Sequence, residues 1–198
     1  MLSPTRSGRP RSAAATKAVL TTALELAHIG GIQHVTIERI AQHANVAKST
    51  IYRRWPNASA VVMDAFLQDI ESSIIYQPTT STPETVKQTI QSLINALSGK
   101  RGKLLRYLIG VAQRNEELQK AFIQQWIEPR RQLGIKVLNQ AINRGELHSS
   151  SDPELILDML YGALYYRMII SFTHPDSSFV NQLVDRVFHG LYQKHADK

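Results

Sequence analysis

Hydrophobic and polar positions repeat with a helical period along most of the chain. Ile37, Ile40 and Ala41 follow the i, i+3, i+4 spacing that places three side chains on one face of a short helix. Comparable apolar stripes recur further along, separated by glycines or by loops rich in Pro, Ser and Thr. The pattern predicts an all-α fold of about nine helices, in which a three-helix N-terminal head is followed by a C-terminal helical bundle.

Residues 36–55 predict two short helices joined by a tight turn. Thr36 stands where an N-cap oxygen is needed, and Asn45 is the non-glycine residue that most readily adopts the positive φ of such a turn. The second helix is expected over residues 47–54, with Ile51 turned inward and small polar, aromatic and basic side chains turned outward. This arrangement is typical of a helix-turn-helix that reads the major groove of DNA.

The chain divides into three predicted segments. Residues 1–11 are rich in Ser, Pro, Gly and Arg without an apolar period, so we expect a flexible basic arm there. Residues 12–57 form the expected DNA-binding head, and residues 58–198 form a larger helical domain that is entered through a long helix over 58–76. Arg9 and Arg11 lie in a Gly-Arg-Pro-Arg string that resembles minor-groove arms, although a plain disordered tail fits as well.

Positive charge gathers in the segment that holds the helix-turn-helix. Up to residue 57 the chain has eight Lys and Arg side chains against two acidic ones, whereas the remainder has fifteen against fourteen. Basic residues that only kept the surface soluble would not be so unevenly placed. The asymmetry therefore favours a polyanionic partner for the head.

Composition argues against several other classes. The chain has no cysteine, and it shows no glycine-rich phosphate loop, serine elbow or paired-carboxylate pattern, so we expect no enzyme and no cofactor. His28, His34 and His43 lack the spacing of metal ligands, so no metal site is expected. No apolar run is long enough to span a bilayer and no signal-peptide core is present, which predicts no membrane association and a cytoplasmic location.

The last two predicted helices, over residues 154–172 and from Asp176 onward, are more apolar around their circumference than a small domain needs. A second copy of the chain would cover this surplus, so we expect a homodimer, with an ordinary internal core as the alternative. The expected interface residues are Leu164, Phe179, Leu183 and Val187.

Residues 13–70 resemble the N-terminal domain of the tetracycline-repressor (TetR) family of bacterial transcription regulators. The resemblance rests on the segments Val-Thr-Ile-Glu-Arg-Ile-Ala at 35–41, Ala-Asn-Val-Ala-Lys-Ser-Thr-Ile-Tyr at 44–52 and Trp-Pro-Asn at 55–57. It implies a dimeric regulator, most simply a repressor, that a small-molecule effector releases from a palindromic operator in double-stranded DNA. The alternative is a helical protein-interaction module without sequence-specific DNA binding, which salt-dependent DNA binding would separate from a regulator.

The resemblance, together with the basic arm, assigns a set of DNA-binding residues. Arg53 is the favoured reader of a base edge and Arg54 its competitor, because arginine can bind guanine bidentately. Tyr52 matches an aromatic residue that binds a phosphate, unless it is a core aromatic, and Trp55 is expected to pack in the core. The full predicted set is Arg9, Arg11, Thr36, Lys48, Ser49, Thr50, Tyr52, Arg53 and Arg54.

Three positions depart from the family pattern. Asn45 replaces a turn glycine, Ala47 replaces a serine or threonine that caps the second helix, and Ala58 replaces a lysine that pairs with a phosphate. The first departure is compatible with the turn, whereas the other two remove a cap and a backbone contact.

The resemblance alone implies an effector pocket, which makes residues 58–198 the expected ligand-binding and dimerisation domain. Aromatic and polar side chains on helices expected to face the middle of the C-terminal domain are its predicted lining, although for each residue taken alone a core position is favoured. Pro129 falls inside the helix expected over 116–143, where it predicts a kink or a break. The predicted ligand-binding residues are Tyr107, Trp126, Tyr161, Tyr165 and Met168.

Overall fold

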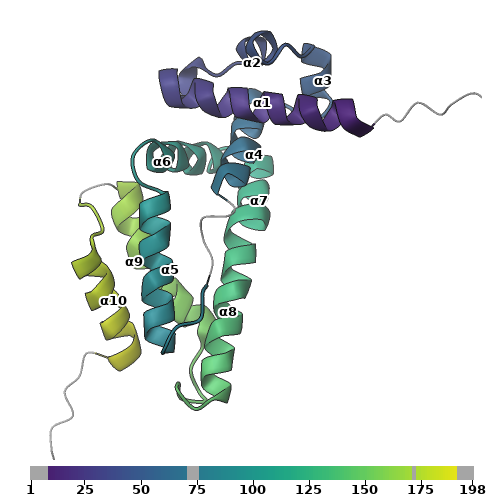
Figure 1. Cartoon of the computed structure of the whole chain (residues 1–198). Helices are drawn as coiled ribbons and strands as arrows, with labels where there is room; N and C mark the ends of the chain where they lie inside the picture. Colours follow the sequence, from purple (N-terminus) through teal and green to yellow (C-terminus); the bar gives the residue numbers. More distant parts are fainter. Residues whose placement is uncertain (1–8, 71–75, 171–172, 191–198) are drawn as a thin grey trace, which may run out of the picture. The chain divides into compact units, whose positions relative to one another are not determined.

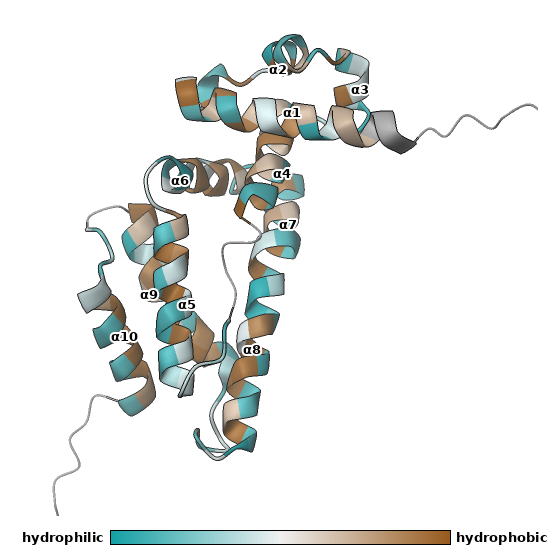
Figure 2. Ribbon diagram, in the orientation of Figure 1, coloured by the Kyte–Doolittle hydropathy of each residue, from teal (hydrophilic) through white to brown (hydrophobic). Residues whose placement is uncertain are grey.

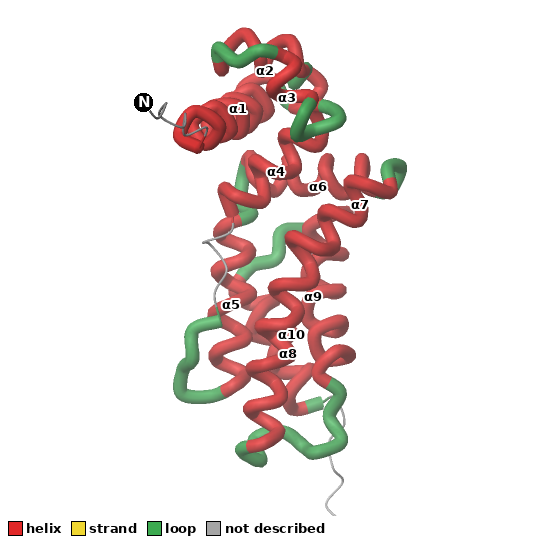
Figure 3. Tube along the Cα trace, turned by 90° about the vertical axis from the view of Figure 1, so that its right-hand side faces the viewer, coloured by secondary structure: helices red, strands yellow, loops and turns green. Residues whose placement is uncertain are grey.

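The computed structural model describes residues 9–70, 76–170 and 173–190, and side chains from Ala13 onward. All regular structure in these ranges is helical, and they contain no strand (Figure 3). In chain order the elements are α1 (Arg9–Gly30), η1 (Ile32–His34), α2 (Ile37–Ala44), α3 (Lys48–Tyr52), α4 (Ala58–Ile70), α5 (Thr82–Ala96), α6 (Lys100–Ala112), α7 (Glu116–Phe122), η3 (Ile123–Ile127), α8 (Glu128–Asn143), α9 (Pro153–Ile170) and α10 (Ser177–His189). The all-α prediction is confirmed. If α7, η3 and α8 are counted as one helical run, the described ranges hold nine helices.

The chain forms two compact units. The first comprises Met1–Glu71 and Lys103–Phe122, and the second Ser72–Gly102 and Ile123–Lys198. The units do not follow the expected boundary after residue 57, because α4 packs against α1 and stays with the head. The expected division into a DNA-binding segment 12–57 and a ligand-binding segment 58–198 therefore stays a prediction about function.

In the first unit, α1 is the platform for the two short helices. Both α2 and α4 contact α1, and α3 contacts α2 (Figure 1). Ile40 of α2, Ile51 of α3 and Phe66 of α4 have no exposed surface, and Val19 and Ala23 of α1 are buried as well. Helices as short as α2 and α3 are marginal in isolation, so this shared core is what fixes them.

The ends of α1 correct one expectation and confirm another. The helix begins at Arg9 rather than at residue 12, so the last three residues of the predicted arm are helical, while residues 1–8 lie outside the described part. Pro10 is compatible with this start, because the first turn of a helix does not use its backbone N–H groups. The predicted glycine stop is confirmed, since α1 ends at Gly30 and Gly31 has a φ of 75°.

The second unit is built from α5, α8, α9 and α10. Helix α10 lies beside α5 and α9, and α9 contacts α8 (Figures 1 and 2). The predicted caps are present: the Asp152 side chain accepts a hydrogen bond from the Glu154 amide, and Asp176 accepts one from the Phe179 amide. The core side chains from the four helices are Val86, Ile90, Leu93, Leu138, Leu157, Leu160, Leu164, Val180 and Val184.

The expected distortion at Pro129 takes the form of a widened turn. The π-helical segment η3 ends just before α8, and Pro129 lies in the first turn of that helix. Proline has no N–H for the carbonyl four residues earlier, and its ring crowds that carbonyl, so a widened turn relieves the clash. The Arg130 Nη1 atom donates a hydrogen bond to the Trp126 carbonyl oxygen at 2.9 Å, which supplies a partner inside the widened segment.

The helix expected over 58–76 is shorter in the described residues. Helix α4 is described to Ile70, residues 71–75 lie outside the described part, and Tyr76 lies in the loop before α5. Tyr76 belongs to the second unit, where its hydroxyl contacts that of Tyr161.

Candidate nucleic-acid interface and ligand cavity

The turn between α2 and α3 is built as the sequence predicts. Thr36 Oγ1 accepts a hydrogen bond from the Arg39 amide at 3.2 Å and so caps α2. Asn45 adopts the left-handed conformation, with φ 51° and ψ 47°. The Val46 amide then donates to the Ala41 carbonyl at 3.0 Å and closes the end of α2. These bonds set the angle at which α3 leaves α2.

Helix α3 is held from behind by buried side chains. It spans Lys48–Tyr52, shorter than the predicted 47–54, and Ile51 has no exposed surface. Trp55, only 7% exposed, donates its indole N–H to Asp64 Oδ2 of α4 at 3.0 Å, so its predicted core role holds. The inward face of α3 is thus fixed, which leaves the opposite face for a partner.

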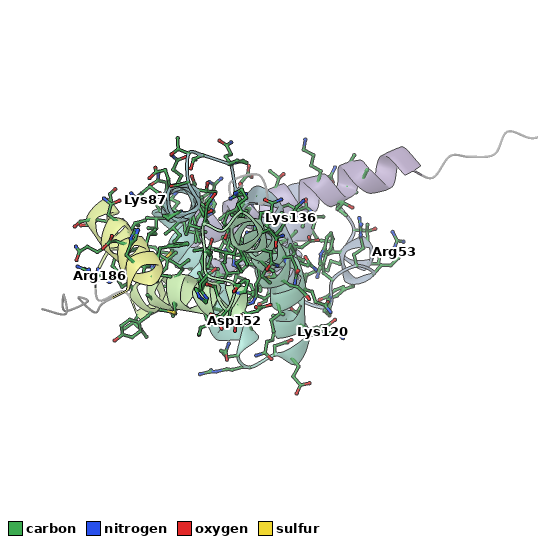
Figure 4. The ribbon with its side chains drawn as sticks, turned by 90° about the horizontal axis from the view of Figure 1, so that it is seen from below. Arg53, Lys87, Lys120, Lys136, Asp152 and Arg186 are labelled. Atoms are coloured by element: carbon green, nitrogen blue, oxygen red, sulfur yellow. The ribbon has the colours of Figure 1, made fainter. Side chains whose placement is uncertain are left out.

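The outward face of α3 carries the predicted contact residues. Tyr52 is 52% exposed and is therefore not a core aromatic. Lys48, Ser49 and Arg53 are also exposed, and Thr50 is half-buried. Figure 4 shows the Arg53 side chain extending away from the ribbon. A polar, aromatic and basic row of this kind is suited to phosphates and base edges.

Arg54 has a different environment from Arg53. Its guanidinium donates to the Thr16 hydroxyl of α1 and lies over the Trp55 ring, 5.4 Å from the centroid. These contacts turn Arg54 back toward the scaffold of the head. The arrangement favours Arg53 over Arg54 as the side chain that reads a base.

The start of α3 has no side-chain cap, and its first residue is paired with an acidic residue of α2. Ala47 occupies the N-cap position and makes no side-chain hydrogen bond there. Lys48 Nζ lies 3.0 Å from Glu38 Oε1, and the hydrogen bond from Lys48 lowers the pKa of Glu38. Both side chains are more than half exposed, so water and salt weaken the pair. A phosphate could therefore replace Glu38 as the partner of Lys48 at little cost.

Arg9 and Arg11 belong to the first turns of α1, but their side chains lie outside the described residues. Their predicted contact with a minor groove stays a prediction.

The second unit contains a cavity of about 60 Å³ between α5, η3, α8 and α9. Three of the five predicted ligand-binding residues line it, namely Trp126, Tyr161 and Tyr165. Tyr107 does not, because it belongs to the first unit and is 40% exposed; Met168 is not among the lining residues either. The full lining is Leu93, Trp126, Ile127, Arg130, Arg131, Leu157, Tyr161 and Tyr165.

The polar groups of this wall are tied to one another. Trp126 donates its indole N–H to the Tyr165 hydroxyl at 2.8 Å, and the Tyr76 and Tyr161 hydroxyls are 2.6 Å apart. The Arg130 guanidinium covers the Trp126 ring at 3.8 Å from the centroid. Burial raises the pKa of both Tyr161 and Tyr165, so each remains a neutral phenol near pH 7.

Sequence reasoning missed five of the lining residues: Leu93, Ile127, Arg130, Arg131 and Leu157. Two of them carried a local signal. Arg130 follows Trp126 by four residues, the spacing at which helical side chains meet. Arg131 forms ion pairs with Glu154 and Asp158 of α9, and a carboxylate spacing of four residues on one helix face could have indicated such a partner.

An exposed apolar stripe runs along α9. Leu155, Met159, Tyr166 and Ile170 are 56%, 48%, 61% and 62% exposed, and their spacing places them on one side of the helix. Leu164, which the sequence predicted at a dimer interface, instead has no exposed surface and belongs to the core.

The α10 residues of the predicted interface are placed differently. Phe179, Leu183 and Val187 are half-buried, so each offers part of its surface to a partner. The Arg167 guanidinium of α9 also lies over the Phe179 ring, 3.9 Å from the centroid.

Within the described ranges, no helix is long and apolar enough to cross a membrane. The same ranges hold no group of three or more His, Cys, Asp or Glu side chains placed to bind a metal ion.

Taken together, the capped turn, the fixed inner face of α3 and its polar, basic outer face define a helix-turn-helix DNA-binding protein. Comparison with known proteins gives the family. The sequence model of "Bacterial regulatory proteins, tetR family" matches residues 19–62, and that of "Tetracyclin repressor-like, C-terminal domain" matches residues 77–187. The HTH-type transcriptional regulator YdeS of Bacillus subtilis is 33% identical over 189 residues, which are 96% of each chain.

Solved structures agree. The TetR family transcription regulator SCO0332 is similar with a TM-score of 0.78 and 27% identity, over 90% of this chain and 99% of its own. FadR from Bacillus subtilis, in complex with stearoyl-CoA, shares the fold with a TM-score of 0.67 at 17% identity, over 89% and 99% of the two chains. This chain belongs to the TetR family of bacterial transcription regulators. It is a helix-turn-helix DNA-binding regulator, and proteins of this family bind operators as dimers.

Proposed function

We propose that this regulator binds a palindromic operator as a dimer, represses transcription there, and leaves the DNA when an effector enters the cavity of the second unit. The observation that carries the proposal is the outer face of α3, where exposed basic and aromatic side chains stand on a helix whose other face is locked. The alternative of an interaction module without DNA binding gives no reason for that face or for the charge gathered before residue 58.

Within the head, each side chain has a proposed role. Arg53 reads a base edge in the major groove, while Lys48, Ser49 and Tyr52 bind phosphates on either side. Thr36 adds a phosphate contact at the start of α2, where backbone amides also point outward. Thr50 contacts the DNA through the exposed part of its side chain, and Arg9 and Arg11 reach the minor groove.

Arg54 has a supporting role in this scheme. Its contacts with Thr16 and Trp55 support holding α3 against α1 rather than touching the bases.

The dimer is proposed to form through the α9 stripe and the adjoining side of α10. The stripe residues Leu155, Met159, Tyr166 and Ile170 are large, apolar and about half exposed or more, which supports a partner covering them. A two-fold axis through this face would carry two heads, which read half-sites roughly 34 Å apart along the duplex.

The effector step links the cavity to the head through the chain itself. Trp126 lies on η3, which directly follows α7, and α7 contacts α4 within the first unit. A ligand that displaces Trp126 would therefore pull on α7 and on α4, the helix that follows the helix-turn-helix. Release from DNA requires the ligand to bind the free form more tightly than the operator-bound form.

The proposal is tested by selecting genomic fragments with the full-length protein and footprinting the fragment retained, with the promoter region of its own gene as the first target. We expect protection of two inverted half-sites, two protein chains for each operator, and lower transcription in vitro from that promoter. A protected site without inverted symmetry, bound by one chain, would contradict the dimeric reading mode. Protection that raises transcription would contradict repression.

A further inference from the structure

The side chains that line the cavity of the second unit offer hydrogen-bond donors and no strong acceptors. Its polar lining groups are two tyrosine hydroxyls, two guanidinium groups and one indole N–H. The other lining residues are Leu93, Ile127 and Leu157, so the lining contains no carboxylate and no side-chain amide. A ligand that satisfies this wall must bring acceptors of its own.

The Tyr165 hydroxyl is the donor best placed for such a ligand. Its oxygen already accepts the Trp126 indole N–H at 2.8 Å, and no acceptor for its own proton is found among the described residues. The Tyr76 and Tyr161 hydroxyls share one hydrogen bond at 2.6 Å, which uses the proton of only one of them. Because burial keeps Tyr161 and Tyr165 protonated, these groups stay donors at neutral pH.

A cationic ligand does not match the same wall. An ammonium group needs acceptors, and the two guanidinium groups of the lining, Arg130 and Arg131, repel it. One of them, Arg130, already covers the Trp126 ring at 3.8 Å from the centroid. Two carboxylates, those of Glu154 and Asp158, are paired with the lining residue Arg131. Neither of these acids is among the residues that line the cavity.

We infer that the cavity binds a compact, largely apolar molecule that carries an acceptor oxygen, either a carbonyl or a carboxylate, and no ammonium group. The Tyr165 hydroxyl donates to that oxygen, and Leu93, Leu157 and the Trp126 ring hold the apolar part. This inference rests on the proposed effector role of the cavity and specifies the chemistry of its ligand.

The size of the cavity adds a consequence. A benzene-sized ligand occupies a cavity of about 150 Å³, whereas this one measures about 60 Å³. A ring therefore enters only if the wall moves, and Trp126 stands on the widened turn η3. Ligand binding should accordingly change the environment of the Trp126 indole, which provides a direct spectroscopic signal.

The test uses four probes with the same ring and different polar groups: acetophenone, benzoate, benzylamine and toluene. Binding to the full-length protein is followed by tryptophan emission in a Trp55→Phe background, which leaves Trp126 as the single indole, and by the shift in melting temperature of the parent protein. We expect acetophenone or benzoate to bind at least tenfold more tightly than benzylamine and toluene. The stronger of the two identifies a neutral carbonyl or a carboxylate as the preferred group.

Substitutions then test the donor itself. Tyr165→Phe keeps the ring and removes the hydroxyl, and should weaken the preferred probe by roughly tenfold. Tyr107→Phe removes an exposed hydroxyl in the first unit and should leave its affinity unchanged. Benzylamine or toluene binding as tightly as the oxygen-bearing probes, binding of none of the four, or equal affinity in parent and Tyr165→Phe would overturn the inference.

Operator release is measured separately, so that the two proposals can fail independently. If the oxygen-bearing probe binds and the operator stays bound, the effector role of the cavity fails while the ligand chemistry stands. If benzylamine is preferred and releases the operator, the effector role stands and the ligand chemistry is wrong.

Discussion

Replacing Gly134 by alanine tests the close packing of α8 and α9 behind the cavity. A Cβ atom built at Gly134 would lie 2.8 Å from Leu157 Cδ2 and 2.8 Å from the Tyr76 hydroxyl oxygen. Both distances are shorter than real Cβ contacts, so the side chains of Leu157 and Tyr76 must both shift. Leu157 lines the cavity, and Tyr76 holds the Tyr161 hydroxyl at 2.6 Å.

The expected change in the free energy of unfolding combines two destabilising effects and one stabilising effect. Forcing a methyl group into a packed core costs about 1–3 kcal/mol of unfolding free energy. Displacing the Tyr76 hydroxyl costs about 1 kcal/mol more through the lost hydrogen bond to Tyr161. Alanine in place of glycine in a helix interior returns about 1 kcal/mol. The net expectation for Gly134→Ala is a loss of about 1–3 kcal/mol, which lowers the melting temperature by roughly 2–4 °C for each kcal/mol in a chain of this size.

The assay is thermal unfolding followed by circular dichroism, with Gly110→Ala as the matched control. Gly110 is also inside a helix, α6, but a Cβ there would meet nothing within 4 Å. Gly110→Ala should therefore raise the melting temperature while Gly134→Ala lowers it. If Gly134→Ala melts at or above the parent temperature, α8 and α9 are not packed as closely as the geometry requires.

Four further predictions concern the turn, the cap, the dimer and pH. Asn45→Ala should destabilise the head by about 1 kcal/mol in urea unfolding, because alanine tolerates the left-handed conformation poorly. Asn45→Gly should leave the stability unchanged, because glycine adopts this conformation freely. An equal loss of stability in both variants would contradict the requirement for a positive φ at position 45. Ala47→Ser should add about 1 kcal/mol through a new cap, and no gain would show that α3 does not need one. Met159→Lys places a charge in the proposed interface and should convert the dimer to a monomer in light scattering. A dimer that persists would exclude the α9 stripe as the interface. Hydrogen bonds from Arg144, and then from Thr82, lower the pKa of Glu146 from 4.5 to about 2. The parent should therefore be more stable than Glu146→Gln by a constant amount above pH 4.5, and this difference should vanish as the pH falls toward 2. A difference that grows as the pH falls would refute this prediction.

The head could be predicted from sequence because local rules decide it. The Thr36 cap, the left-handed Asn45 and the inward Ile51 each depend on residues within a few positions along the chain. The contact that turns Arg54 back toward α1 could not be predicted. It depends on Thr16, a residue of α1 that only the folded head brings into contact with Arg54.

The cavity was predicted less completely, because its wall is made by contacts between distant elements. Tyr107 and Tyr165 both lie in strongly apolar helical stretches of the sequence. Tyr107, however, is exposed in the first unit, whereas Tyr165 lines the cavity of the second unit. Pro129 indicates a distortion, but the sequence alone does not decide between a break and the widened turn that is observed. The exposed stripe on α9 lies within a strongly apolar stretch. The sequence alone therefore does not distinguish the exposed stripe residues from the buried Leu164.

Whether α3 reads DNA is measured by the salt dependence of operator binding by the parent, Arg53→Ala and Lys136→Ala. Lys136 is exposed on α8 in the second unit, so its substitution removes the same charge from a residue that is not part of the first unit. Affinity should fall steeply with salt. Arg53→Ala should lose about 1–3 kcal/mol of binding free energy and tolerate changes at one base pair, whereas Lys136→Ala should match the parent. Equal affinity and equal sequence preference in Arg53→Ala and Lys136→Ala would contradict the assignment of α3 as the element that reads DNA.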